Sequence, residues 1–277
     1  MKIGFIGAGK VGCSLGAYFG QVAELAGYAS QSTASAEEAA RLTGTQSFPN
    51  GAELLSNCDA VFITTPDSQI NAVWEDLKTQ LAEKNGAFAG KLVCHCSGAM
   101  ASTELSGAEE LGACVYSVHP LFAISSKTVS RTELGKAFFA VEGTPKRLDL
   151  ITSMLEKLGN PYQVIKTEDK VRYHAAAALA SNHVVALYRL ACDELKRCGF
   201  TGDSAEKALA PLFLGNAEHI AHDGCIEALT GPAERGDMTT IQKHLACLDG
   251  QTREVYELLN ETLLRIAAVK HGEIKPA

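Results

Sequence analysis

MKIGFIGAGKVGCSLG, residues 1–16, begins with a short apolar run and continues into three glycines spaced G-x-G-x-x-G. Gly7 permits a tight turn, Gly9 lets a pyrophosphate approach the backbone, and Gly12 lets a helix pack closely on a strand. The helix that begins here directs its N-terminus at the negative charge. Because the glycines follow a predicted strand and open a predicted helix, the motif predicts dinucleotide binding rather than an ordinary glycine turn.

The second half of the predicted nucleotide site follows the next strand. An NAD site usually carries Asp or Glu about 20 residues after the glycines, to accept a hydrogen bond from the ribose. Residues 30–33 here read SQST, and Glu37 and Glu38 are expected in the exposed first turn of the next helix. Hydroxyl groups, with Arg41 reaching back, suit a 2′-phosphate. We therefore predict NADP(H) in preference to NAD(H), which is the alternative.

The predicted cofactor contacts comprise the glycine loop and the ends of two following strands: Gly7, Ala8, Gly9, Lys10, Val11, Gly12, Ser30, Ser32, Thr65 and Pro66.

The chain changes character near residue 166. Before it, the apolar runs KIGFI, DAVFIT, KLVCHC and ACVYSV alternate with amphipathic segments, and KAFFAVE and YQVIK are candidates for edge strands. Continuous apolar runs are typical of parallel strands covered on both faces. After it, helical patterns cover about 168–199, 203–222, 237–248 and 251–270. We predict an α/β fold, with a doubly wound domain at 1–165 and an all-α domain at 166–277.

Composition restricts the possible partners. The 277 residues are 46% hydrophobic and 21% charged, as in soluble globular proteins. A net charge of -7 without a dense basic run argues against nucleic acid. The first apolar run is too short for a signal peptide, and Asn182, His183 and Arg189 interrupt the longest apolar stretch, which argues against a membrane span. The expectation is a cytoplasmic protein with a small-molecule substrate.

VCHCSGAMAS, residues 93–102, places Cys94, His95 and Cys96 in a row. Successive strand side chains face opposite ways, so the three cannot bind one metal ion, and no metal is predicted. The nine cysteines lack framework spacing and are expected to be buried thiols. Ser97 ends a predicted strand, where parallel sheets bind ligands, although a turn or helix-capping serine is the alternative.

Two histidines and an asparagine join Ser97 as predicted catalytic residues. His119 is expected at the end of the next strand, overlooking the same crevice, and histidine transfers protons near neutral pH. His174 and Asn182 interrupt an apolar helix that is expected to bury most of its surface, so a functional role is predicted for both. Lys170, on the same helical stripe as His174, is expected to be solvated.

The motifs IGFIGAGKVG, CSGAMAS, VHPL, FFAVEG, HAAAALASN and ALTGPAERGD together resemble the Rossmann-like NADP oxidoreductases, often labelled deazaflavin-dependent, that carry a C-terminal helical domain of unknown function. The resemblance covers nearly the whole chain. The layout is also similar to 6-phosphogluconate, 3-hydroxyisobutyrate and prephenate dehydrogenases, ketopantoate reductase and pyrroline-5-carboxylate reductase.

These resemblances imply roles for particular residues. The one to prephenate dehydrogenases implies substrate contacts for Ser97 and His119. The one to hydroxyacid dehydrogenases points to Lys170 and Asn182, whose spacing departs from that group's usual short interval. Pairing of the helical domains in such enzymes implies a homodimer.

The expected function is that of an NADP(H)-dependent oxidoreductase with its site between the two domains. Hydride passes between the nicotinamide and a carbonyl, imine or hydroxyl-bearing carbon. His119 or His174 handles the proton, while Ser97 and Asn182 orient the reacting group. Two alternatives stay open: a deazaflavin:NADP oxidoreductase, and an NADP(H)-binding sensor or assembly protein without chemistry.

Overall fold

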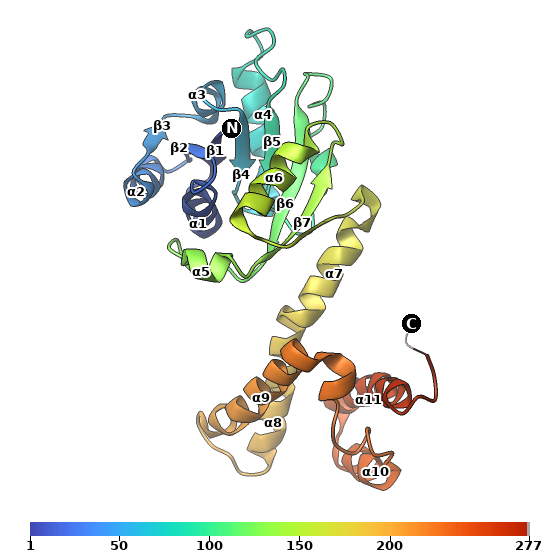
Figure 1. Cartoon of the computed structure of the whole chain (residues 1–277). Helices are drawn as coiled ribbons and strands as arrows, with labels where there is room; N and C mark the ends of the chain where they lie inside the picture. Colours follow the sequence, from blue (N-terminus) through green and yellow to red (C-terminus); the bar gives the residue numbers. More distant parts are fainter. Residues whose placement is uncertain (276–277) are drawn as a thin grey trace. The chain divides into compact units, whose positions relative to one another are not determined.

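The computed structural model describes residues 1–275 (Figure 1). The chain divides into two compact units, Met1–Leu179 and Ala180–Ala277. Each unit is described by itself below. The division at Leu179 reflects only which residues contact one another. It does not test the predicted domain boundary near residue 166, which stays a prediction.

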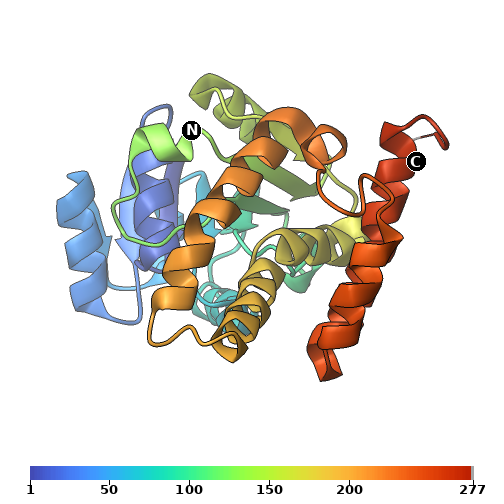
Figure 2. The ribbon, with the colours of Figure 1, turned by 90° about the horizontal axis from the view of Figure 1, so that it is seen from below.

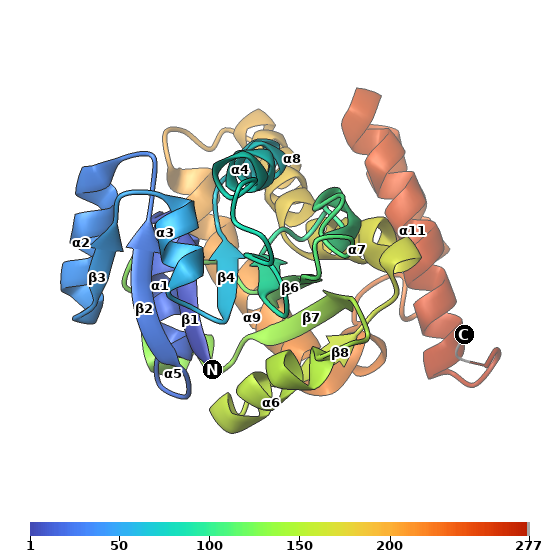
Figure 3. The ribbon, with the colours of Figure 1, turned by 90° about the horizontal axis from the view of Figure 1, so that it is seen from above.

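The first unit is built on one eight-stranded sheet with the order β3-β2-β1-β4-β5-β6-β7-β8, which Figure 3 shows from β3 to β8. All neighbouring strands run parallel except β6 and β7. The order reverses between β1 and β4, so the sheet has a switch point there. This confirms the predicted doubly wound fold. The strands are β1 Lys2–Ile6, β2 Glu24–Ala29, β3 Gln46–Phe48, β4 Ala60–Ile63, β5 Leu92–His95, β6 Cys114–Leu121, β7 Phe138–Gly143 and β8 Tyr162–Val164.

Helices cover both faces of the sheet. One hydrophobic cluster joins the sheet to α1, α2, α5 and α6, and a second joins it to α3 and α4. Within β4, Phe62 belongs to the first cluster, whereas Val61 and Ile63 belong to the second. This alternation explains why the strands read as continuous apolar runs. The helices are α1 Lys10–Phe19, α2 Thr33–Thr43, α3 Gly51–Ser56, α4 Asp67–Gln80, α5 Arg131–Leu134 and α6 Leu148–Leu158.

Three details of the sheet differ from the prediction. The expectation that His119 ends its strand is wrong, because β6 continues to Leu121 and His119 pairs with Ala140. The segment KAFFAVE was expected at an edge, but β7 lies between β6 and β8. The apolar runs in the sequence did not indicate β2 or β3. A glycine interrupts the apolar pattern of β2 at Gly27, where a φ of 145° and the close approach of Gln46 exclude a side chain.

The C-terminal helices follow the predicted segments closely. They are α7 Lys170–Ala180, preceded by a 3-10 turn Thr167–Asp169, then α8 Asn182–Arg197, α9 Ser204–Ala228, α10 Met238–Cys247 and α11 Gly250–Lys270. The expected single helix over 168–199 breaks at Ser181, whose ψ is -84°. Within α9, Gly224 has a φ of 79° and interrupts the helix. Figure 2 shows α11, in red, as one continuous helix.

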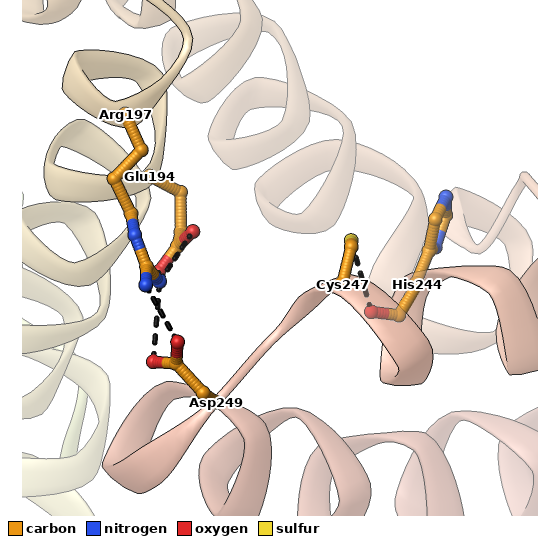
Figure 4. A network of polar contacts seen from close by, with 5 residues as sticks. All are labelled: Glu194, Arg197, His244, Cys247 and Asp249. Atoms are coloured by element: carbon orange, nitrogen blue, oxygen red, sulfur yellow. Dashed lines mark hydrogen bonds and ion pairs between the residues drawn. The ribbon is translucent and has the colours of Figure 1, made fainter.

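An ion-pair network connects α8 to the start of α11 (Figure 4). Arg197 contacts Asp249, the residue before α11, at 2.6 Å and Glu194, one turn back on α8, at 3.1 Å. In the same view, the Cys247 thiol donates to the His244 carbonyl at 3.1 Å, near the end of α10. Because Arg197 and Asp249 are exposed, water screens their charges and the pair adds little to the stability of the fold.

The stretch Thr167–Arg197 is long and apolar enough to span a membrane by length and composition alone. Helices of soluble proteins pass the same test. The break at Ser181 and the exposed polar residues Asn182, His183 and Arg189 lie within this stretch. Cytoplasmic location therefore stays a prediction.

Candidate functional site

The glycine loop joins β1 to α1 with little free space beneath it. Gly7 has a φ of 107°, and a Cβ there would lie 2.9 Å from the Thr65 backbone nitrogen. A Cβ on Gly12 would collide with the Gly7 carbonyl and the Thr64 hydroxyl. That hydroxyl donates to the Gly7 carbonyl at 2.8 Å and holds the turn. Gly7 and Gly12 are therefore needed by the fold itself.

Gly9 differs from the other two glycines. A Cβ on Gly9 would meet nothing within 4 Å, and the φ of -80° suits any residue. The absence of a side chain is therefore not required by packing at this position. Without a side chain at Gly9, the backbone is open to a cavity of about 670 Å³, a volume within the usual range for a ligand site. The loop thus fits the pyrophosphate of a dinucleotide.

The predicted cofactor contacts divide into two groups. Those that line this cavity are Gly7, Ala8, Gly9, Ser30, Thr65 and Pro66. Those that lie outside its lining are Lys10, Val11, Gly12 and Ser32. The Ser32 side chain caps α2 by accepting from the Ser35 amide at 3.3 Å.

Glu37 and Glu38, which were expected in the first turn of α2, lie after that turn, because the helix begins at Thr33. Glu38 forms an ion pair with Lys127, a residue of the loop after β6, at a distance of 2.7 Å. Arg41, expected to reach back to the nucleotide, lies in the last turn of α2 and outside the cavity lining. Lys127 lines the cavity instead.

Ser97 is buried and its hydrogen bonds are internal. Its hydroxyl donates to Asp67 at 2.7 Å and accepts from the amides of Ala99 and Met100 at 3.2 and 3.0 Å. These bonds use the donor and both acceptor positions of a hydroxyl. Their geometry favours the turn-forming role for Ser97, in which it shapes the loop that follows β5.

The structure brings His119 and His174 together at Gly98. A Cβ on Gly98 would lie 2.8 Å from Nε2 of His119 and 2.6 Å from Nδ1 of His174. The two rings are 6.3 Å apart. Nδ1 of His119 shares a 2.7 Å hydrogen bond with the Tyr173 hydroxyl. Two imidazole nitrogens thus pack directly against Gly98 and leave no room for a side chain there.

Electrostatics hold the His119 ring neutral. Burial, followed by the positive charge of Lys170, lowers the pKa of His119 to about 4. Burial also lowers the pKa of His95, which is fully buried beneath the same loop and bonded to the Ala101 carbonyl at 3.1 Å. At neutral pH the rings of His119 and His95 are therefore uncharged, and Lys170 provides a buried ammonium group close to His119.

Lys170 was expected to be solvated, and the structure corrects this expectation. The side chain is completely buried, and Nζ donates to Ser117 Oγ at 2.6 Å. Ser117 in turn donates to the Ser97 carbonyl at 3.1 Å. Burial lowers the pKa of Lys170 to about 8, and Glu142 opposes that shift. The lysine is therefore a supporting residue of the Ser97–Gly98 loop.

Glu142, a single acid in the apolar strand β7, balances this lysine. It is fully buried and accepts from the amide and hydroxyl of Ser102 at 2.7 and 2.8 Å, and from Thr167 at 2.7 Å. The sequence feature that could have indicated this network is the single acid, Glu142, in the apolar segment FFAVEG. Sequence analysis missed Glu142, Ser117, Tyr173 and Asp67, since none belongs to a spaced motif.

Asn182 belongs to the second unit and is exposed at the start of α8. Its predicted role rested on a helix that buries most of its surface, but most residues of α7 and α8, including His174, are exposed. The predicted catalytic role of Asn182 stays a prediction.

The thiols of residues 93–96 face the hydrophobic cluster. Cys94 belongs to it and Cys96 packs against it. Burial raises the pKa of Cys94, and raises that of Cys96 to about 12, so both are protonated thiols. Within residues 1–275, no three His, Cys, Asp or Glu side chains gather as a metal site would require. Cys198, Cys225 and Cys247 are exposed, in contrast to the expectation of burial.

Comparison with protein families matches both parts of the chain. Residues 1–120 match the Rossmann-like domain, and residues 137–263 match a domain of unknown function, DUF2520. The chain pairs a Rossmann-like domain with a DUF2520 domain. These matches confirm the resemblance that the sequence motifs indicated. His119 lies at the end of the Rossmann-like match, and His174 lies within the DUF2520 match.

Solved structures resemble the fold of this chain over nearly their full length. A protein of Thermotoga maritima has a TM-score of 0.78 and 24% identity, covering 97% of this chain and 99% of its own. A Bacteroides fragilis protein provisionally named an NADP oxidoreductase has a TM-score of 0.64 and 21% identity, covering 95% and 98%. At these identities the likeness shows the fold.

A Plasmodium falciparum pyrroline carboxylate reductase, solved with NADP bound, has a TM-score of 0.57 and 14% identity, covering 96% of this chain and 98% of its own. No protein of curated function matches the sequence.

Proposed function

We propose that this protein is an NADP(H)-dependent oxidoreductase acting on a small carbonyl, imine or hydroxy compound. The observation that carries the proposal is the pair of imidazoles at Gly98, which is connected to the nucleotide cavity by a short path. Pro66 lines that cavity, and the next residue, Asp67, holds Ser97 beside Gly98. The two imidazoles are therefore linked to the lining of the nucleotide cavity through Asp67, Ser97 and Gly98. The names of two similar structures, an NADP oxidoreductase and an NADP-bound reductase, support the same reaction class.

The neutral His119 ring suits both directions of the reaction. Bound NADP(H) supplies or accepts the hydride. When the Tyr173 phenol donates to Nδ1 of His119, the ring proton is on Nε2, the nitrogen that lies near Gly98. There it donates to a carbonyl oxygen or an imine nitrogen. In the other tautomer Nε2 accepts a hydroxyl proton. We propose that His174, whose Nδ1 also lies near Gly98, relays this proton.

Substitution of the two histidines tests this mechanism. NADPH oxidation would first be followed with a panel of carbonyl and cyclic imine substrates. With the best substrate, we expect His119→Gln and His174→Gln each to lower kcat by about 10²–10⁴-fold, because each removes a group that transfers a proton. His244→Gln is the matched control, since His244 is bonded to Tyr256 within the second unit.

The alternatives predict other results. Full turnover in both histidine variants would remove these residues from the mechanism. Tight NADPH binding without turnover of any substrate in the panel would favour a sensor or assembly role. Turnover that requires a deazaflavin would identify the deazaflavin-linked reaction.

We further propose that the functional unit is a homodimer formed through the second unit. Both hydrophobic clusters of the described chain lie in the first unit. In the second, large apolar side chains stand exposed on three helices: Val185, Leu187, Leu212, Phe213, Leu214, Ile220, Leu258 and Leu259. A second copy of the same helices offers a matching apolar surface.

Light scattering during gel filtration checks the dimer. We expect the wild-type protein to have twice the mass of the chain, and Leu212→Glu to shift it towards the monomer because the charge cannot be buried against a second apolar face. Leu111→Glu, which changes an exposed leucine of the first unit, is expected to leave the mass unchanged. A wild-type monomer at all concentrations would contradict the proposal.

A further inference from the structure

We infer that Lys127 is the residue that selects NADP(H) over NAD(H), by binding the 2′-phosphate. This inference rests on the proposed function. Of the described residues that line the nucleotide cavity, Lys127 is the one lysine or arginine. It comes from the loop between β6 and α5, about 100 residues after the end of β2, where such a cation is usually sought.

The loop holds Lys127 in place from both sides. Ser14, buried on α1, donates its hydroxyl proton to the Ser126 carbonyl at 3.0 Å and accepts from the Val129 amide at 3.3 Å. One side chain of the helix that follows the glycine loop thus bonds the residues flanking Lys127. A cation fixed by its backbone loses less freedom when it binds an anion than a free surface lysine does.

The ion pair with Glu38 locates the lysine near the ribose. Glu38 lies one helical turn after Ser35, so the two side chains share a face of α2. Ser35 lines the cavity together with Ser30 and Gln31 at the end of β2. In doubly wound folds this strand end receives the adenosine ribose. The 2.7 Å contact between Lys127 Nζ and Glu38 Oε2 therefore places a cation beside the expected 2′ position.

Glu38 also sets the limit of this selectivity. Its carboxylate competes with a 2′-phosphate for Lys127 and repels the phosphate charge. It is not at the strand end, where an acid would bind the ribose hydroxyls of NAD(H). We therefore assign Glu38 the role of holding Lys127 in the free protein, with the phosphate as the stronger partner when it is present.

Binding titrations of the full-length protein, followed by cofactor fluorescence, test the assignment without any substrate. We expect the wild type to bind NADPH more tightly than NADH. Lys127→Gln should weaken NADPH binding about tenfold or more and leave the Kd for NADH within about twofold, because only NADPH has the third phosphate. Glu38→Gln should tighten NADPH binding. Lys2→Gln, which removes a lysine from an exposed ion pair with Glu24 outside the cavity lining, is the matched control and should change neither.

Other results overturn the inference. An equal loss of NADPH and NADH affinity in Lys127→Gln would assign the lysine to the shared pyrophosphate, and the proposed function would stand. A loss of NADH affinity in Glu38→Gln would make Glu38 the ribose ligand and remove the basis for NADP(H) selection. A wild-type protein that binds neither nucleotide would overturn both this inference and the proposed function.

Discussion

Replacing Lys170 with methionine is expected to lower the free energy of unfolding by about 1–3 kcal/mol, because it removes a buried hydrogen-bond donor and the positive charge that interacts with Glu142. Methionine fills much of the volume of the lysine stem, so the loss reports the charge rather than a cavity. Ser117 also loses its donor, and with it the Ser97 carbonyl loses support from Nζ. Chemical denaturation measures the change.

The matched control is the double variant Lys170→Met with Glu142→Gln. Glutamine keeps acceptors for Ser102 and Thr167 but carries no charge, so we expect it to recover a large part of the stability. Equal loss in the single and double variants would mean that the lysine does not balance Glu142.

The pH dependence gives a second measurement of the same pair. The pKa of Lys170 is lowered from 10.5 to about 8 in the folded protein. Between these values the unfolded chain binds the proton and the folded chain does not, so the wild type gains stability as pH rises from about 8 to 10.5. The methionine variant lacks this gain, and the stability difference between the two proteins should widen over that range.

Replacing Gly9 with valine is expected to abolish NADPH binding, with a loss of at least about a hundredfold, while the protein stays folded. The valine side chain would project into the open cavity where the pyrophosphate must approach the backbone. Neither steric contact nor φ opposes the substitution within the protein. Fluorescence titration measures the affinity, and thermal unfolding without ligand checks the fold.

Two comparisons isolate this effect. Gly215→Ala, on α9, adds a methyl group to an equally open position and should leave binding unchanged. Gly12→Ala should instead lower stability, because its Cβ collides with the Gly7 carbonyl. If Gly9→Val bound NADPH as the wild type does, the loop would not be the pyrophosphate site.

Local patterns predicted most of the architecture, because each depends on neighbouring residues. The glycine spacing predicted β1, the turn and α1, and the apolar runs located β4, β5 and β6. The long helices followed from their periodicity and from the glycines that separate them. By contrast, β2 carries Gly27 at a close crossing with β3, and that crossing exists only in the folded sheet.

The candidate site was less predictable, because it is assembled from distant segments. His119 and His174 were chosen for their positions, and the structure does bring them to one glycine. The helical pattern could not distinguish a solvated Lys170 from a buried one, since its partner Glu142 lies on a strand 28 residues earlier. Likewise, Lys127 is in a loop without regular periodicity, so only the folded chain connects it with Glu38.

The first turn of α7 has a mechanical consequence. Lys170, Tyr173 and His174 all belong to the compact unit that ends at Leu179. The backbone leaves helical geometry at Ser181, just beyond that limit. A hinge motion that begins there would carry none of the three side chains with it. Such a motion would therefore leave the mutual spacing of the paired histidines unchanged.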